Sequence, residues 1–169
     1  MSRTALLPIV NDDPALARDA EELYDALEDL LRVYQFRDRD RICCFDVSVS
    51  QCYALEGLIR KGSMTLNELA AYLYLDKSTA SRVVDALERK DYAARTPHPK
   101  DRRAVLLEAT ASGRELEGKI RESILAEERE LIADFAPEVR QAMTQLLRRF
   151  ARAAAAQVET AGGSCCRTQ

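Results

Sequence analysis

Small hydroxyl and cationic side chains are concentrated in one polar segment of the chain, from Lys77 to Arg103. Hydroxyls can bond to phosphate oxygens at close range, and an arginine can pair with guanine or bind a phosphate. Residues 77–104 contain eight Lys or Arg and four Asp or Glu, a net charge of +4, whereas the whole chain carries −3 and its remainder therefore −7. Positive charge concentrated on one segment of an acidic chain indicates a nucleic-acid-binding surface.

The candidate DNA contacts are polar residues of this segment. They are Lys77, Ser78, Thr79, Ser81, Arg82, His98, Lys100, Asp101, Arg102 and Arg103. Residues 77–90 taken alone are also compatible with an ordinary solvated helix face, which is what most polar stripes are. The basic run at 97–103 favours DNA, because it holds a single acid, Asp101, among its cations.

Two short helices, four residues apart, must position the first group of these residues. Thr65 and Glu68 have the spacing of a capping box, which predicts that the first helix begins at Thr65. Asp76 can cap a second helix that runs to about Lys90. Helical spacing turns one set of residues of the second helix inward (Ala80, Val83, Val84 and Leu87) and another outward (Ser78, Thr79, Ser81, Arg82 and Asp85).

A β-hairpin is expected after the second helix. Residues 93–96 and 103–109 have the composition of short strands, and two prolines between them exclude a helix and stiffen the loop. The base and tip of this hairpin carry Arg95, His98, Lys100, Arg102 and Arg103. Two helices followed by a basic hairpin predict a winged helix-turn-helix DNA-binding domain over residues 48–110.

Residues 77–90 and 101–110 resemble the recognition helix and wing of the MarR (multiple antibiotic resistance regulator) family. The resemblance is specific over residues 64–113 and only architectural outside them. It implies a homodimeric repressor, or less often an activator, whose two winged domains read an inverted repeat in double-stranded DNA. It also implies that a small molecule, metal or oxidant changes the affinity for DNA.

The resemblance also assigns roles to individual positions. Residues matching Ser78, Thr79, Ser81 and Arg82 contact the major groove or its phosphates in the family. Those matching Asp101 and Arg103 shape the wing, with the arginine reaching the minor groove or adjacent phosphates. The chain departs from the family at Asp91, where a glycine often ends the recognition helix; aspartate tolerates the left-handed conformation better than most residues.

The remaining sequence predicts a mainly α fold. Apolar repeats predict helices over residues 13–36, 49–61 and 111–135, and a final helix that begins at Pro137. We expect residues 1–37 and 111–160 to supply dimerisation helices, because a single winged domain needs fewer apolar faces. The alternative is a helical bundle within one chain. Residues 161–169 are expected to form a flexible tail containing cysteines.

Two vicinal cysteine pairs form a second candidate site. Cys43 and Cys44 lie in the link before residues 49–61, and Cys165 and Cys166 lie in the tail, whereas Cys52 should be a buried apolar residue. Vicinal thiolates can bind a soft metal or metalloid, and the arginines at 37, 39 and 41 could lower the thiol pKa values. Incidental cysteines, soft-metal or metalloid sensing, oxidant sensing and an organic effector all remain open, and no cofactor is required.

Other function classes are disfavoured. The sequence has no glycine-rich phosphate loop, HExxH or GxSxG, so an enzyme is not expected. It also has no secretory leader and no apolar run approaching ~20 residues, which predicts a cytoplasmic protein without a membrane partner. The competing function is a winged-helix protein-interaction module that does not bind DNA sequence-specifically.

Overall fold

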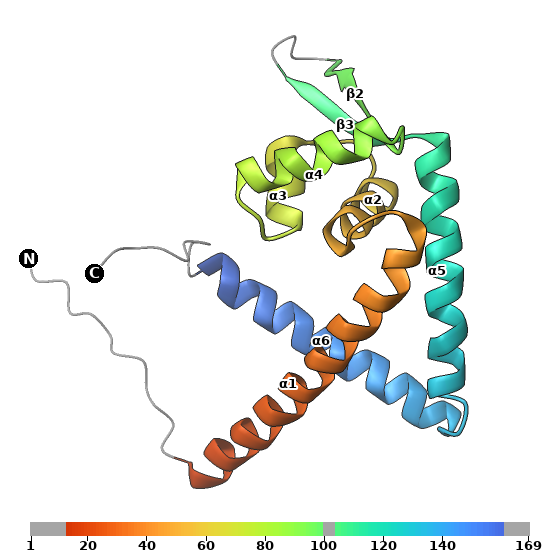
Figure 1. The fold of residues 1–169 in the computed structure, drawn as a ribbon. Coiled ribbons are helices and arrows are strands. Elements are labelled where there is room, and N and C mark those ends of the chain that lie inside the picture. The colour runs from red at the N-terminus through yellow and green to blue at the C-terminus, as the bar shows by residue number, and fades with distance from the viewer. Residues whose placement is uncertain (1–12, 100–103, 161–169) are drawn as a thin grey trace, which may run out of the picture. The chain divides into compact units, whose positions relative to one another are not determined.

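The structure is a computed structural model that describes residues 13–99 and 104–160 (Figure 1). Residues 1–12, 100–103 and 161–169, and with them the expected tail, lie outside the described part. The chain divides into two units, residues 1–40 and 41–169, which are described separately. The elements in chain order are α1 (Pro14–Ile42), the 3-10 helix η1 (Cys43–Phe45), α2 (Val49–Lys61), β1 (Met64–Thr65), α3 (Leu66–Tyr72), α4 (Lys77–Arg89), β2 (Ala93–Pro97), β3 (Val105–Ala109), α5 (Ala111–Leu131) and α6 (Pro137–Thr160).

The described part of the first unit is almost entirely helix α1. The sequence predicted an end near Phe36, but α1 continues to Ile42. The apolar repeat stops before that point, and charged residues extend the helix: Arg37 donates to Asp38 at 3.1 Å, and its guanidinium lies 4.0 Å from the ring centroid of Tyr34. Several large apolar side chains of α1 are exposed, namely Leu16, Leu23, Tyr24, Leu30, Leu31, Val33 and Phe36.

Side-chain caps determine where the helices of the second unit begin. Thr65 Oγ1 accepts from the Glu68 amide at 3.3 Å, and Glu68 Oε2 accepts from the Thr65 amide at 2.7 Å, which confirms the predicted capping box. These bonds to Thr65 hold the pKa of Glu68 below its usual range. α2 ends at Lys61 as predicted, and Gly62 follows with φ of +87°, a conformation that glycine adopts without strain.

The main core lies between α2, α3, α4 and the sheet. Its fully buried leucines are Leu55, Leu58, Leu69, Leu87 and Leu107. Burying a leucine side chain stabilises the folded state by ~1.5–3 kcal/mol, so these five side chains contribute strongly to the stability of the module. Gly57 allows the ring of Tyr72 to lie directly on α2, because a Cβ at position 57 would lie 2.6 Å from Tyr72 Cε1.

The sheet has three strands in the order β1-β3-β2, whereas the sequence predicted only the hairpin. β2 and β3 pair antiparallel, with Ala93 opposite Ala109 and Pro97 opposite Val105. β1 adds two residues, Met64 and Thr65, on the other side of β3. The hairpin therefore attaches directly to the segment that begins α3.

A second, smaller core joins α2 and α5. It consists of Ile42, Val47, Cys52 and Ile120, so Cys52 is buried as predicted. α5 ends at Leu131, short of the predicted Phe135, and a turn leads to Pro137, which begins α6 as predicted. α6 has exposed apolar residues along its length: Val139, Met143, Leu146, Leu147, Phe150 and Val158.

None of the described helices combines the length and the apolar composition that crossing a bilayer requires.

Candidate nucleic-acid interface

Helices α3 and α4 are joined by a tight turn that leaves one face of α4 exposed. The amide of Tyr74 donates to the carbonyl of Ala71 at 3.2 Å, and the amide of Leu75 donates to that of Ala70 at 2.9 Å. Tyr74 itself has φ of +53°, which an L-residue adopts only at a cost of ~1–2 kcal/mol. The turn thus fixes the direction of α4 through backbone hydrogen bonds at the expense of strain at one exposed tyrosine.

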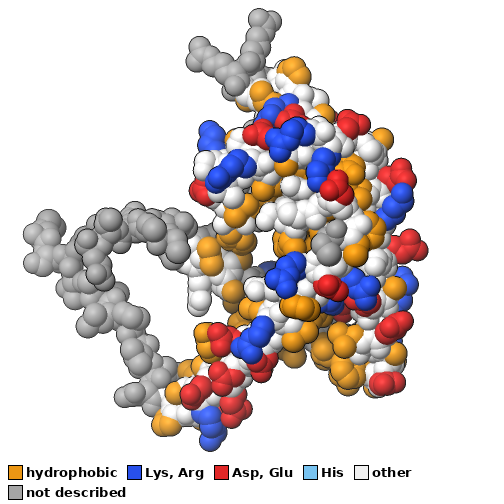
Figure 2. Space-filling model, in the orientation of Figure 1, with side chains coloured by type: hydrophobic (Ala, Val, Ile, Leu, Met, Phe, Trp, Pro, Cys, Tyr) orange, Lys and Arg blue, Asp and Glu red, His pale blue; other side chains and the backbone are white. Residues whose placement is uncertain are grey.

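The inward and outward faces of α4 largely follow the prediction. Ala80, Val84 and Leu87 are fully buried, and Val83 is half-buried against the same core. On the opposite face the predicted contacts lie together: Lys77, Ser78 and Arg82 are exposed, and Thr79 and Ser81 are half-buried. Lys and Arg side chains gather over α4 and the base of the hairpin in Figure 2, with acidic side chains between them.

Asp76 caps α4 and also binds the hydroxyls of that face. Its Oδ1 accepts from the Thr79 amide at 2.9 Å and from the Ser78 hydroxyl at 2.6 Å, and its Oδ2 accepts from the Thr79 hydroxyl at 2.6 Å. These hydrogen bonds, led by the one from Ser78, lower the pKa of Asp76 well below its usual range. The hydroxyl hydrogens that a phosphate contact would require are thus donated to Asp76 in this structure.

Arg82 extends this arrangement. Its Nη2 donates to Thr79 Oγ1 at 3.1 Å, so that the guanidinium is connected through one hydroxyl to the Asp76 carboxylate. The sequence analysis identified Asp76 as a cap and Thr79 and Arg82 as contacts, but missed the connection between them. The spacing of three residues between successive members, which places them on one side of a helix, was the available signal.

Arg95 has a different role from the expected one. It was predicted to contribute to the basic surface of the hairpin, with Asp85 pointing outward, but its Nη2 binds Asp85 at 2.8 Å and its Nη1 binds Glu88. The hydrogen bond that Arg95 donates to Asp85 and the nearby charge of Glu88 raise the pKa of Arg95. Two acids of α4 therefore neutralise this arginine and attach β2 to α4.

The C-terminal end of α4 contacts the segment that follows η1. Lys90 Nζ lies 3.3 Å from Asp46 Oδ1 and also donates to the Asp46 backbone carbonyl. Asp91 has φ of +58°, which confirms the left-handed helix end expected there. The Asp91 carbonyl accepts from the hydroxyls of Thr110 and Ser112 at 2.6 and 2.7 Å, and these bonds connect the end of α4 to the start of α5.

The hairpin is described only in part. Lys100, Asp101, Arg102 and Arg103 lie outside the described residues. His98 is half-buried, and its amide donates to the carbonyl of Ala104 at 3.1 Å across the hairpin. The structure thus places five of the ten predicted contacts on one face of α4 and one at the described end of the wing.

Most of the predicted cysteine site lies outside the described residues. Cys44 is exposed in η1, while the side chain of Cys43 and both tail cysteines lie outside the description. Two of the arginines expected to activate the thiols have carboxylate partners, because Arg41 pairs with Glu127 and Arg37 with Asp38. The described part of the chain contains no group of three or more His, Cys, Asp or Glu that could hold a metal ion.

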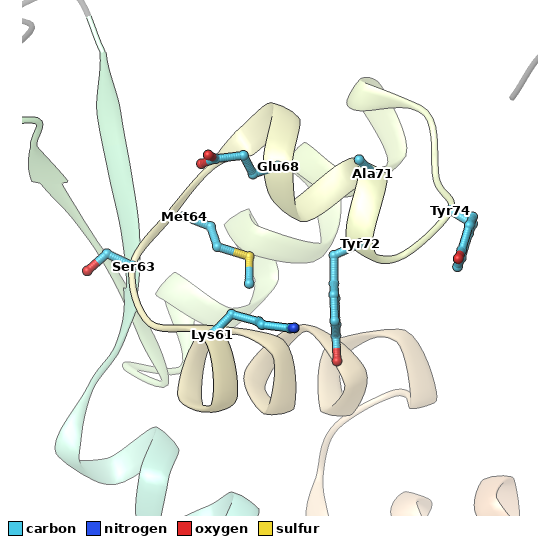
Figure 3. A pocket seen from close by; sticks show the side chains of 7 residues that line it. All are labelled: Lys61, Ser63, Met64, Glu68, Ala71, Tyr72 and Tyr74. Carbon is cyan, nitrogen blue, oxygen red and sulfur yellow. The ribbon is translucent and has the colours of Figure 1, made fainter. Parts of the chain in front are cut away.

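A shallow cavity of about 790 Å³ lies beside α3 (Figure 3). It is lined by Lys61, Ser63, Met64, Glu68, Ala71, Tyr72 and Tyr74. The carboxylate of Glu68 is already engaged by Thr65, and the cavity is largely open to solvent. No sequence pattern indicated this cavity, and it shares no residue with the predicted DNA contacts.

Comparison with known proteins identifies similar chains. The sequence profile of the MarR family matches residues 45–104. An uncharacterized HTH-type transcriptional regulator of Mycobacterium leprae is 36% identical over 100 residues, which cover 59% of this chain and 67% of that protein. The HTH-type transcriptional repressor MdtR of Bacillus subtilis is 34% identical over 67 residues, 40% of this chain and 43% of MdtR. The solved structure of a MarR family protein from Bacillus stearothermophilus is similar with a TM-score of 0.74 and 23% identity, over 82% of this chain and 96% of that one.

Proposed function

The chain belongs to the MarR family of HTH-type transcriptional regulators, and we propose that it acts in the cytoplasm as a homodimeric repressor bound to an inverted repeat in double-stranded DNA. The observation that carries this proposal is the exposed face of α4, where Ser78, Thr79 and Arg82 lie together at the capped start of the helix. Repression is supported by the relative MdtR, which is a transcriptional repressor.

Dimer formation is supported by apolar faces that the second unit does not cover. The α6 side chains Leu146 and Leu147 are 65% and 50% exposed, and their spacing places them with Val139, Met143 and Phe150 in one exposed apolar stripe, a feature that marks interaction sites. We assign residues 1–37 and 111–160 to the dimer contacts and residues 48–110 to DNA. In such a dimer the two copies of α4 should enter successive major grooves about one helical turn apart, ~34 Å.

Substitutions at two arginines test the DNA surface. Arg103→Ala should weaken binding to all duplexes and lower the slope of log affinity against log salt by about one, as the loss of one phosphate contact does. Arg82→Ala should in addition relax the sequence preference, with a cost of roughly 1–3 kcal/mol at the base pair it reads. Fluorescence anisotropy over a range of salt concentrations measures both effects. If both variants bind like the parent, the assigned surface is wrong.

The competing function, a winged module that binds only proteins, makes the opposite prediction for the parent chain. It requires no salt-dependent shift of any duplex in a gel, because no phosphates are neutralised. The net charge of +4 over residues 77–104 favours DNA, and it already includes Arg95 with its partners Asp85 and Glu88, which together contribute −1.

For the effector, we propose a thiolate site at Cys43 and Cys44, with Cys165 or Cys166 as further ligands, whose occupation by a soft metal or metalloid, or whose oxidation, releases DNA. The ion pair between Lys90 and Asp46 supports an effector site at this position, because it connects the segment that follows η1 to the end of α4. A ligand that favours the non-binding arrangement by ~100-fold would supply about 2.7 kcal/mol.

Titration of the protein–DNA complex with arsenite, copper(I), zinc and a peroxide tests this site. The parent should release DNA with at least one agent, and a variant carrying Cys43→Ser and Cys44→Ser should not. Equal responses of the two proteins, or no response of the parent, would make the cysteines incidental. An organic ligand near the same link would then be the leading effector class.

A further inference from the structure

We propose that Asp76 and Thr79 are positioning residues that direct the guanidinium of Arg82 toward a guanine in the major groove. This inference rests on the proposed DNA binding and adds which residues set one base preference. A freely rotating arginine can bind a phosphate as well as a base edge, and it loses side-chain entropy when it is ordered. If the Arg82 side chain is already ordered before it contacts DNA, less entropy is lost on binding. This favours a base edge, which requires a defined geometry of the guanidinium.

Three side chains form one hydrogen-bonded chain along the start of α4. Asp76 Oδ2 accepts from the Thr79 hydroxyl at 2.6 Å, and Thr79 Oγ1 accepts from Arg82 Nη2 at 3.1 Å. The hydroxyl has a single hydrogen, and a carboxylate can only accept. The hydrogen of Thr79 must therefore point to Asp76, which leaves the oxygen lone pairs for Arg82. The hydrogen bonds thus run in one direction, from the Arg82 guanidinium through the Thr79 hydroxyl to the Asp76 carboxylate.

The carboxylate at the end of this chain is held in its charged form. Ser78 donates to Asp76 Oδ1 at 2.6 Å and the Thr79 amide donates to the same oxygen at 2.9 Å. The amide bond also fixes Asp76 to the first turn of α4, so the acceptor of the Thr79 hydroxyl cannot move independently of the helix. The rigid element in this arrangement is the helix start, and the flexible arginine is aligned to it.

The acids closest in sequence beyond Arg82 do not compete for its guanidinium. Asp85 and Glu88 are engaged by Arg95 from β2. Within residues 13–99 and 104–160, Arg82 forms no salt bridge, and its side chain is exposed. The pairing of Arg95 thereby leaves Arg82 as a cation of α4 that can take an external partner.

The partner of Arg82 follows from the donors that remain. A guanidinium has five N–H donors in one plane, and Thr79 engages one of them. Guanine presents two acceptors, O6 and N7, side by side at the edge of the major groove, and an arginine can donate to both. A phosphate can also accept two hydrogen bonds from a guanidinium, but it lies on the DNA backbone and not on the floor of the groove that α4 would enter. We therefore assign guanine as the partner.

The test begins with a duplex that the parent protein selects from a random pool, and with the same duplex altered at one base pair at a time. Arg82→Ala identifies the base pair that Arg82 reads. Thr79→Val then removes the hydroxyl with little change of shape, and Thr79→Ser, the matched control, keeps it. Asp76→Asn keeps an equally good cap for α4 but offers one carbonyl oxygen in place of two carboxylate oxygens.

The parent should prefer guanine at that base pair by about 5- to 150-fold, the range for one bidentate pair. Thr79→Val and Asp76→Asn should lose most of this preference. Asp76→Asn, whose side chain is not among the predicted DNA contacts, should also keep the parent's affinity for random duplex within about twofold and its unfolding temperature. Thr79→Ser should retain the preference. If Thr79→Val lowers the unfolding temperature, the guanine preference of Asp76→Asn alone tests the positioning role.

Two results would count against different claims. If Arg82→Ala alters the preference at one base pair but Thr79→Val and Asp76→Asn do not, or if the base read is not guanine, the positioning role is wrong while the DNA surface stands. If the parent selects no sequence from the pool, the proposed function fails.

Discussion

Replacing Gly113 by alanine should destabilise the protein by ~3 kcal/mol, the upper end of the usual cost of overpacking and a large part of the 5–15 kcal/mol free energy of unfolding of typical domains. A Cβ at position 113 would overlap the backbone carbonyl oxygen of Tyr92 and lie 2.9 Å from its carbon. That oxygen accepts from the Thr110 amide at 3.1 Å, and Thr110 Oγ1 accepts from the Gly113 amide at 3.0 Å. Neither backbone segment can move without breaking the junction between β3 and α5. Urea unfolding followed by circular dichroism measures the loss.

Gly118 is the matched control on the same helix. No atom lies within 4 Å of a Cβ built there, so Gly118→Ala should stabilise α5 by about 0.5–1 kcal/mol through its higher helix propensity. If Gly113→Ala lowers the free energy of unfolding and Gly118→Ala raises it, the loss at position 113 is caused by the contact with Tyr92. Equal stability of Gly113→Ala and the parent would mean that the start of α5 can shift away from that carbonyl.

A double substitution on α6, Leu146→Asp with Leu147→Asp, should convert the proposed dimer into a monomer. Both side chains are exposed in one chain, so the charges should leave its fold intact, whereas two buried carboxylates per subunit are not tolerated in an apolar interface. A monomer binds only one half of the inverted repeat at a time, whereas a dimer binds both halves together and therefore more tightly. The affinity for the inverted repeat should therefore fall by ~100-fold or more.

Sedimentation at micromolar concentration and fluorescence anisotropy together test this expectation. Gln145→Asp, on the opposite side of α6 and also exposed, adds a charge without touching the apolar stripe and should leave both measurements unchanged. A double variant that sediments as a dimer and binds like the parent would exclude this face of α6 from the interface. The oligomer would then have to be held by α1 or α5.

The sequence analysis predicted most helix starts because their signals are local. Thr65, Asp76 and Pro137 each precede or begin a helix in a way that depends only on their neighbours, and the structure confirms all three. Helix ends were less accurate. α1 continues past Phe36 to Ile42, whose burial in the second core depends on residues distant in sequence and so gave no local signal, and α5 stops early at Leu131.

Features that depend on distant residues were missed. β1 has two residues, and only its pairing with Leu106 and Leu107 defines it as a strand. Arg95 looked like a surface cation because its partners, Asp85 and Glu88, lie on another element, and only the folded hairpin brings them together. The role of Asp76 beyond capping was missed for a different reason: the hydroxyls of Ser78 and Thr79 could donate to a phosphate or to Asp76, and only the side-chain geometry shows that they donate to Asp76.

Tyr92 lies between α4 and β2. Its side chain packs against both the main core and the smaller second core, as does Leu116 of α5. A side chain shared by two clusters couples their opening, since loosening either one removes packing from the other. The winged module and the first half of α5 should therefore unfold as one cooperative unit, with similar protection of their amides from hydrogen exchange. Local melting of α4 would then be a costly route to releasing DNA. In the proposed dimer we expect an effector to turn this unit as a rigid body instead, which would change the distance between the two copies of α4.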